Sequence, residues 1–176
     1  MWVAKNAAHP RGSHKIPWTP LGAKLSLRTK RLLTTTNKMT AALAPTDPVT
    51  ELLKRAKTIA VVGLSDDPMR VSHGVSAYMQ SHGYRIIPVN PWIESALGEK
   101  AYASLLEVPE KIEIVNIFRR PEFVEKVVDQ AIQLKVPAIW MQEDVIHEKA
   151  AEQARQAGIF VVMDRCILKE HRKRFR

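Results

Sequence analysis

The sequence predicts an α/β protein with a Rossmann-like, doubly wound sheet of five mostly parallel strands and helices on both faces. From residue 47 onward, short apolar runs alternate with longer amphipathic segments. The apolar runs carry few polar residues, which is typical of parallel strands that are buried on both faces. Right-handed connections between such strands place the intervening helices on both sides of the sheet.

Each element is expected where its residue pattern changes. The strands are expected over residues 58–63, 84–89, 113–118, 138–142 and 159–164. The helices are expected over residues 47–54, 71–82, 121–134 and 145–157, with a helical turn near residues 103–106. Asp47 fits the N-cap of the first helix, and Pro48 fits its first helical position. Gly83 and Gly158 fit the stops of two later helices.

The positive charge of the chain lies almost wholly at its amino end. The net charge is +9, but residues 1–46 hold eight Lys or Arg and no acidic residue. Nucleic-acid binding needs a basic face on the folded part, so we expect no nucleic-acid partner. We interpret the basic tail, residues 169–176, as a solvated terminal charge run. A nucleic-acid binder that works through the leader and this tail is a rival hypothesis.

We divide the chain into a basic leader, residues 1–46, and one folded domain, residues 47–176. The leader is rich in Arg and hydroxyl side chains, as organellar transit peptides are, but it shows no clear amphipathic helix. We favour a true start at Met39 or a disordered extension, and a cytoplasmic location. The mitochondrial matrix is the alternative. The chain's longest apolar run falls far short of the roughly 20 residues that cross a bilayer, so we expect no membrane partner.

The turn after the first strand does not fit a site for NAD. Residues 63–68 read GLSDDP, with one glycine where a dinucleotide site has three. The second strand ends at Asn90 and Pro91, without the carboxylate that would bind the ribose hydroxyls. Both features argue against hydride transfer.

The same turn has features of a phosphate site. The amino end of the following helix offers free backbone N–H groups to an anion. Ser65, Arg70 and Ser72 can donate hydrogen bonds beside it. The alternative, equally good on the turn alone, is that Ser72 only caps the helix and Arg70 is a surface residue.

The sequence contains no recognisable catalytic or metal-binding set. The six histidines and the single cysteine, Cys166, show no metal-ligand spacing, so we expect no metal. Cys166 follows Arg165 at the start of a segment where a helix can begin, and such a thiol can be reactive. His73 lies near the expected cleft. An enzyme that uses Cys166 or His73 is therefore the alternative to a binding protein, although a buried structural cysteine and a half-exposed histidine are simpler interpretations.

Several motifs, in order along the chain, resemble those of the small stand-alone CoA-binding proteins. They include AVVGLS at 60–65, HGYRIIPVNP at 82–91, NIFRRPE at 116–122 and VVMDRC at 161–166. The resemblance covers about residues 52–171. It implies a Rossmann-like domain similar to the amino-terminal CoA-binding domain of the succinyl-CoA synthetase alpha subunit. In that enzyme the phosphorylated histidine lies in a following domain.

The resemblance implies a protein that binds CoA or acyl-CoA without a catalytic centre of its own. Such a protein would be a carrier, a sensor or the partner of a CoA-using enzyme. His73 departs from the family pattern, which often has Pro-Ser-Tyr or similar where this chain has Val71-Ser72-His73. The resemblance implies ligand contacts at eight positions: Gly63, Ser65, Arg70, Ser72, Asn90, Pro91, Phe118 and Arg119.

Overall fold

Five parallel strands form the central sheet, in the order β2-β1-β5-β6-β7. The computed structural model describes residues 47–175, so the expectations for the leader lie outside the described residues. The strands are β1 (Thr58–Val62), β2 (Arg85–Val89), β5 (Ile114–Ile117), β6 (Ala138–Met141) and β7 (Phe160–Val162). The five-stranded, doubly wound sheet predicted from the sequence is confirmed.

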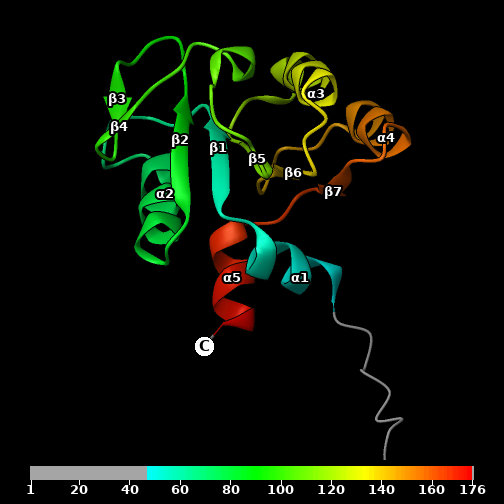
Figure 1. Ribbon diagram of the computed structural model, residues 1–176, viewed down its shortest axis with the longest axis horizontal. Helices are drawn as coiled ribbons and strands as arrows, with labels where there is room; N and C mark the ends of the chain where they lie inside the picture. The colour runs from blue at the N-terminus through cyan, green and yellow to red at the C-terminus, as the bar shows by residue number, and fades with distance from the viewer. Residues whose placement is uncertain (1–46, 176) are drawn as a thin grey trace, which may run out of the picture. The chain divides into compact units, whose positions relative to one another are not determined.

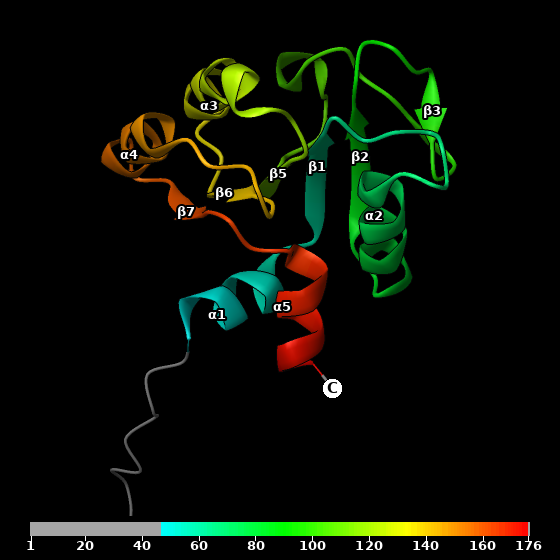
Figure 2. The ribbon, with the colours of Figure 1, turned by 180° about the vertical axis from the view of Figure 1, so that it is seen from behind.

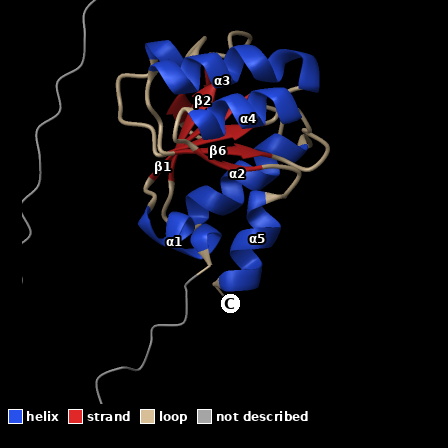
Figure 3. Cartoon of the chain, turned by 90° about the vertical axis from the view of Figure 1, so that its right-hand side faces the viewer, coloured by secondary structure: helices blue, strands red, loops and turns tan. Residues whose placement is uncertain are grey.

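Helices cover both faces of this sheet (Figures 1, 2 and 3). Three of them pack against one face: α1 (Pro48–Arg55), α2 (Val71–Ser81) and α5 (Ile167–Arg174). Helices α3 (Val124–Gln133) and α4 (Glu148–Gln156) pack against the other face. Each face has its own apolar core because successive strand residues point to opposite sides. None of the helices between residues 47 and 175 is long and apolar enough to cross a membrane.

The smaller elements differ from the expectation in three places. A hairpin of β3 (Ser95–Ala96) and β4 (Glu99–Lys100) follows β2, where no regular element was predicted. The predicted helix over 121–134 begins as a 3-10 turn, η2 (Pro121–Phe123). The helical turn predicted near 103–106 is the 3-10 turn η1 (Leu105–Glu107).

Helix α4 begins three residues later than predicted because a side chain caps it there. The Nδ1 atom of His147 accepts a hydrogen bond from the backbone N–H of Ala150, at 3.2 Å. A side-chain acceptor at the N-cap satisfies a backbone donor that has no partner inside the helix. The capping histidine therefore fixes the helix start.

The basic tail forms a packed helix, so its interpretation as a solvated charge run was wrong. Ile167 and His171 lie one turn apart and are both buried, which gives α5 a face that packs on the domain. Arg174 forms ion pairs with Asp47, at 2.6 Å, and with Glu170. Counting charges overlooks this face, because the basic run at residues 172–174 that follows it dominates the composition.

His171 lies in an aromatic cluster where α5 packs against α2. Its Nδ1 atom is 3.0 Å from the hydroxyl of Tyr78, and its ring lies 5.0 Å from that of His82 and 5.7 Å from that of Tyr84. The ring centroid of Phe175 lies 4.7 Å from that of His171. Burial lowers the pKa of His171, and a positive charge on His82 lowers it further.

We expect this cluster to make the domain less stable in mild acid. The pKa of His171 is lower in the folded state than in the unfolded chain, so the unfolded state binds more protons as the pH falls below about 6.5. Stability is therefore present above that pH and is lost as the pH falls through the folded pKa. Urea unfolding between pH 7.5 and 5.5 measures it. His171→Gln should flatten the pH dependence. Equal slopes in wild type and His171→Gln would contradict the assignment.

Candidate functional site

The strand order reverses at β1, which has β2 on one side and β5 on the other. The connection after β1 runs into α2 on one face of the sheet, and the connection after β5 runs into α3 on the other. In doubly wound sheets, the two loops then diverge at the carboxyl ends of these strands and leave a crevice that binds ligands. The candidate site is this edge of the sheet.

Gly63 brings the loops after β1 and β5 into contact. Its φ is +86°, and its backbone N–H donates to the carbonyl of Val89 at 2.9 Å. A Cβ atom at this position would lie 2.5 Å from the carbonyl oxygen of Phe118 and 3.3 Å from Cδ of Arg119. The structure therefore brings together three of the predicted site residues, and it leaves space there for glycine alone.

Side-chain hydrogen bonds hold the turn after Gly63 in shape. The hydroxyl of Ser72 accepts from the backbone N–H of Ser65, at 3.2 Å. The hydroxyl of Ser65 in turn accepts from the N–H of Asp67, at 3.1 Å. The side-chain amide of Asn90 donates to the carbonyl of Leu64, at 2.9 Å, and ties the end of β2 to the same turn. Ser72 thus anchors the turn. The sequence interpretation in which Ser72 only caps the helix is wrong, because no side chain among residues 47–175 caps this end of α2.

The amino end of α2 keeps backbone donors free for an anion. Arg70 is its N-cap residue, and no side chain of the described part of the chain caps this end. The first N–H groups of a helix have no partner within it, and the helix dipole is positive there. The carboxylate of Asp67 accepts from the N–H of Met69 at 2.9 Å and lies 3.8 Å from Nε of Arg70. This acid is therefore partly neutralised within its own turn.

The basic side chains near the site differ in their exposure. The side chain of Arg70 is 73% exposed, and that of Arg120 is 84% exposed and lies near Glu122. Arg119 is half-buried and lies beside Gly63. Of these three arginines, Arg119 is the one that the backbone holds against the glycine turn.

The loop after β2 presents apolar surface at the same edge. Pro91 is exposed, and Trp92 is 84% exposed although it is a large apolar residue. The N–H of Trp92 donates to the side-chain oxygen of Asn90, at 3.2 Å. Asn90 therefore uses both ends of its side-chain amide to hold this loop to the turn after β1.

A pair of buried amides lies at the carboxyl ends of β5 and β6, and sequence reasoning did not select it. Asn116 and Gln142 are 1% and 4% exposed, and Nε2 of Gln142 donates to Oδ1 of Asn116 at 2.7 Å. A signal was present in the sequence: Asn116 interrupts the apolar run Ile114–Ile117, where every other side chain is hydrophobic. A buried polar group in such a strand indicates a specific hydrogen-bonding role.

The two residues of the alternative, enzymatic hypothesis differ in their burial. Cys166 is buried and packs in the same apolar cluster as Trp140. His73 is half-buried at the start of α2. Among residues 47–175, no group of His, Cys, Asp or Glu side chains is arranged to hold a metal ion.

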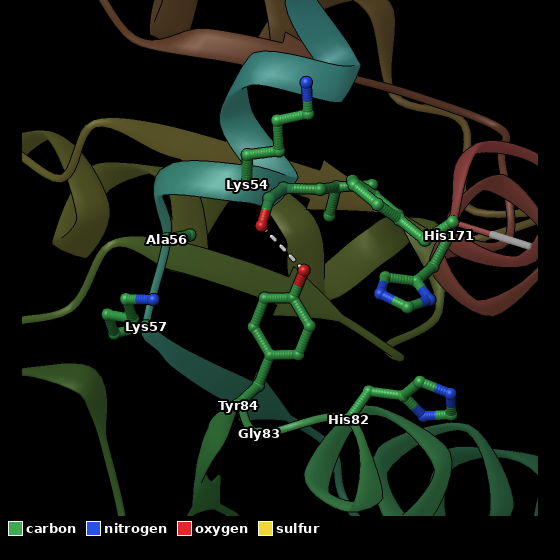
Figure 4. Close-up of a pocket in the computed structure, with 9 residues that line it drawn as sticks. Lys54, Ala56, Lys57, His82, Gly83, Tyr84 and His171 are labelled. Carbon is green, nitrogen blue, oxygen red and sulfur yellow. Dashed lines mark hydrogen bonds between the residues drawn. The ribbon is translucent and has the colours of Figure 1, made fainter.

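A pocket of about 250 Å³ lies at the opposite end of the sheet (Figure 4). Its walls include Lys57 just before β1, Tyr84 just before β2, and His171 of α5. The hydroxyl of Tyr84 donates to the carbonyl of Leu53 across it, at 2.7 Å. The pocket contains none of the eight predicted ligand-contact residues, which all lie at the carboxyl ends of the strands or at the start of α2.

Residues 57–172 match the family model described as CoA binding domain, so the chain belongs to this family. It is 47% identical over 123 residues to the "Uncharacterized protein YneT" of Bacillus subtilis, covering 70% of this chain and 91% of that protein. The solved structure of a hypothetical protein from Pyrococcus horikoshii OT3 superposes with a TM-score of 0.70 at 39% identity, covering 71% of this chain and 88% of that one.

A shorter match links the chain to a larger protein. It is 33% identical over 69 residues to subunit alpha of the ADP-forming acetate–CoA ligase II of Pyrococcus furiosus. That match spans 39% of this chain and 15% of the ligase subunit. The family that the sequence motifs indicated is therefore confirmed by whole-domain relatives and by this partial one.

Replacing Gly63 by alanine should destabilise the domain more than the same change at an unobstructed glycine. Gly98 is the matched control, because its φ is +77° but a Cβ atom there would meet no other atom within 4 Å. Gly98→Ala should cost about 1–2 kcal/mol through its positive φ. Gly63→Ala should cost roughly 2 kcal/mol more, because the backbone of Phe118 must move. Urea unfolding measures both, and equal losses would show that the close approach is not a constraint.

Proposed function

We propose that this chain is a non-catalytic CoA- or acyl-CoA-binding protein, and that its ligand lies at the carboxyl ends of β1, β2 and β5. Membership of the CoA-binding family supports the ligand class. The partial match to a CoA ligase subunit supports it as well. The observation that carries the location is the contact between Gly63 and the end of β5, which leaves the start of α2 open beside the strand switch point.

In this proposal, the phosphates of CoA lie at the amino end of α2. The free N–H groups of the helix and its dipole favour a phosphate there. Arg119 supplies a positive charge from the other loop of the crevice. Arg70, Ser65 and Pro91 line the outer part of the ligand path, and Trp92 offers an exposed ring on which the adenine can stack.

The proposal favours CoA over NAD because of what the second strand presents. NAD sites of this fold use an acidic residue near the end of the second strand to bind the ribose hydroxyls. Here that position holds Asn90, whose amide is already used to fix the turn after β1. CoA carries its charge on phosphates and extends through a neutral pantetheine arm, so it needs amide donors and arginine in place of a carboxylate.

The role that we propose is to carry or sense CoA, or to serve a CoA-using enzyme as a partner, in the cytoplasm. The ligase subunit provides a parallel, because the matched segment is a small part of a much longer chain. A stand-alone version of such a domain can present CoA to a separate protein.

Calorimetric titration of the full chain with CoA, acetyl-CoA and NAD tests this function. We expect saturable binding of CoA or acetyl-CoA and no binding of NAD. Arg119→Gln should weaken CoA binding by about tenfold or more, because it removes a charge-assisted hydrogen bond to a phosphate.

Arg120→Gln is the matched control for this titration. The side chain of Arg120 is 84% exposed and lies near Glu122, so the change should alter CoA affinity less than about threefold. A folded protein that takes up neither CoA nor acetyl-CoA would contradict the proposed function. Equal losses in the two arginine variants would contradict the placement of the phosphates.

A further inference from the structure

We infer that Asn116 and Gln142 together bind the two amide groups of the pantetheine arm, and so select pantetheine-containing ligands over plain nucleotides. This inference rests on the proposed function, because it assigns a second part of the same ligand to a second part of the same crevice. The eight ligand contacts that the family resemblance implies do not include this pair.

The pair lies on the sheet face that α2 and α5 cover. Asn116 is two residues from Ile114, and Gln142 is two residues from Trp140, so the alternation of strand side chains places all four on one face. Ile114 and Trp140 belong to the apolar core shared with α1, α2 and α5. Asn116 pairs across the sheet with Val61 of β1, one residue before the strand end that leads into Gly63. The two amides therefore lie just beneath the crevice at the strand switch point.

The bond between the two amides leaves one donor edge and one acceptor edge unused. Nε2 of Gln142 donates to Oδ1 of Asn116, so Nδ2 of Asn116 and Oε1 of Gln142 are left over. Neither of these two atoms bonds to another residue between 47 and 175. Turning both amides over exchanges the roles but again leaves one donor and one acceptor.

These two unused atoms are not fully enclosed. In the described part of the chain, Ser76 Oγ is the side-chain atom that is fully enclosed without a hydrogen-bond partner. Asn116 Nδ2 and Gln142 Oε1 are not fully enclosed in this way, although the two residues are only 1% and 4% exposed overall. What little of each side chain remains accessible therefore includes the atom that lacks a partner.

A neighbouring donor and acceptor, held in place by an internal bond, complement the two secondary amides of one ligand arm. The N–H of one ligand amide can donate to Gln142 while the carbonyl of the other accepts from Asn116, because a trans amide points its own N–H and C=O to opposite sides. The pantetheine arm of CoA contains two secondary amides, whereas adenosine 3′,5′-bisphosphate, the nucleotide part of CoA, contains none. Buried amides in an apolar sheet discriminate well, because a ligand without matching groups leaves them unpaired.

Titration with CoA and with adenosine 3′,5′-bisphosphate separates this inference from the proposed function. In the wild-type full chain, CoA should bind at least about tenfold more tightly than the bisphosphate, which corresponds to two neutral hydrogen bonds. Binding of both ligands with equal affinity would overturn the inference and leave the CoA site itself intact. Binding of neither would overturn the proposed function and the inference together.

A double variant tests the two residues directly. Asn116→Leu combined with Gln142→Met removes both partners and keeps their approximate volume, which changes stability less than removing one partner alone. CoA affinity should fall about tenfold or more, while the affinity for the bisphosphate should change less than twofold.

Gln153→Met is the matched control, because Gln153 lies on α4 at the other face and bonds to Asp129. It should leave both affinities unchanged. Equal losses for the two ligands in the double variant, or no loss for either, would overturn the inference. Should the double variant fail to fold, the wild-type comparison of CoA with the bisphosphate decides the question by itself.

Discussion

The close approach of two backbones at Gly63 is the constraint on which the rest of the site depends. The turn after β1 touches the carbonyl of Phe118 at the end of β5, and a side chain at position 63 would push these segments apart. Because they touch, the amino end of α2 lies over the strand switch point, and Arg119 lies beside the turn. The hydrogen bonds of Ser72 and Asn90 hold the same turn from its other sides. One positive-φ glycine thus positions the donors that an anionic ligand requires.

The sheet combines this open edge with a closed and almost wholly apolar interior. Strands β1, β5 and β6 are buried on both faces. Each buried polar residue in these strands or at the ends of the sheet must therefore find a hydrogen-bond partner. Asn116 and Gln142 partner each other, and the hydroxyl of Tyr84 finds the carbonyl of Leu53 at the far end. The two ends of the sheet therefore differ in kind. The carboxyl end carries backbone donors and amides, whereas the amino end carries an aromatic and histidine pocket.

The fold could be read from the sequence because its signals are local. Apolar runs without polar alternation predict buried parallel strands, and Gly83 and Gly158 predict helix ends. The start of α4 at Glu148 could not be predicted, because it depends on a histidine side chain that caps the helix. The packing of α5 was missed because its buried face rests on two residues within a basic segment.

The site was predictable in part. Motifs indicated the family and the loops, and the family comparison confirmed the family. The three-dimensional roles of Ser72 and Asn90 were not predictable, since each bonds to a residue that a linear pattern does not pair with it. The Asn116–Gln142 pair joins residues 26 positions apart through neighbouring strands, and it becomes visible only when the strand register is known. Whether a site residue binds ligand or shapes its loop is a question of contacts, which the sequence does not contain.

The most direct test of the account is a map of backbone amide chemical shifts in the full chain as CoA is added. The account predicts that the largest changes fall on Gly63, Ser65, the first residues of α2, Asn90 and Phe118, at one edge of the sheet. Lys57, Gly83 and Tyr84, which line the pocket at the other end, should stay nearly unchanged. Changes concentrated on those three residues, with the Gly63 turn unmoved, would contradict the account and place the ligand in the aromatic and histidine pocket.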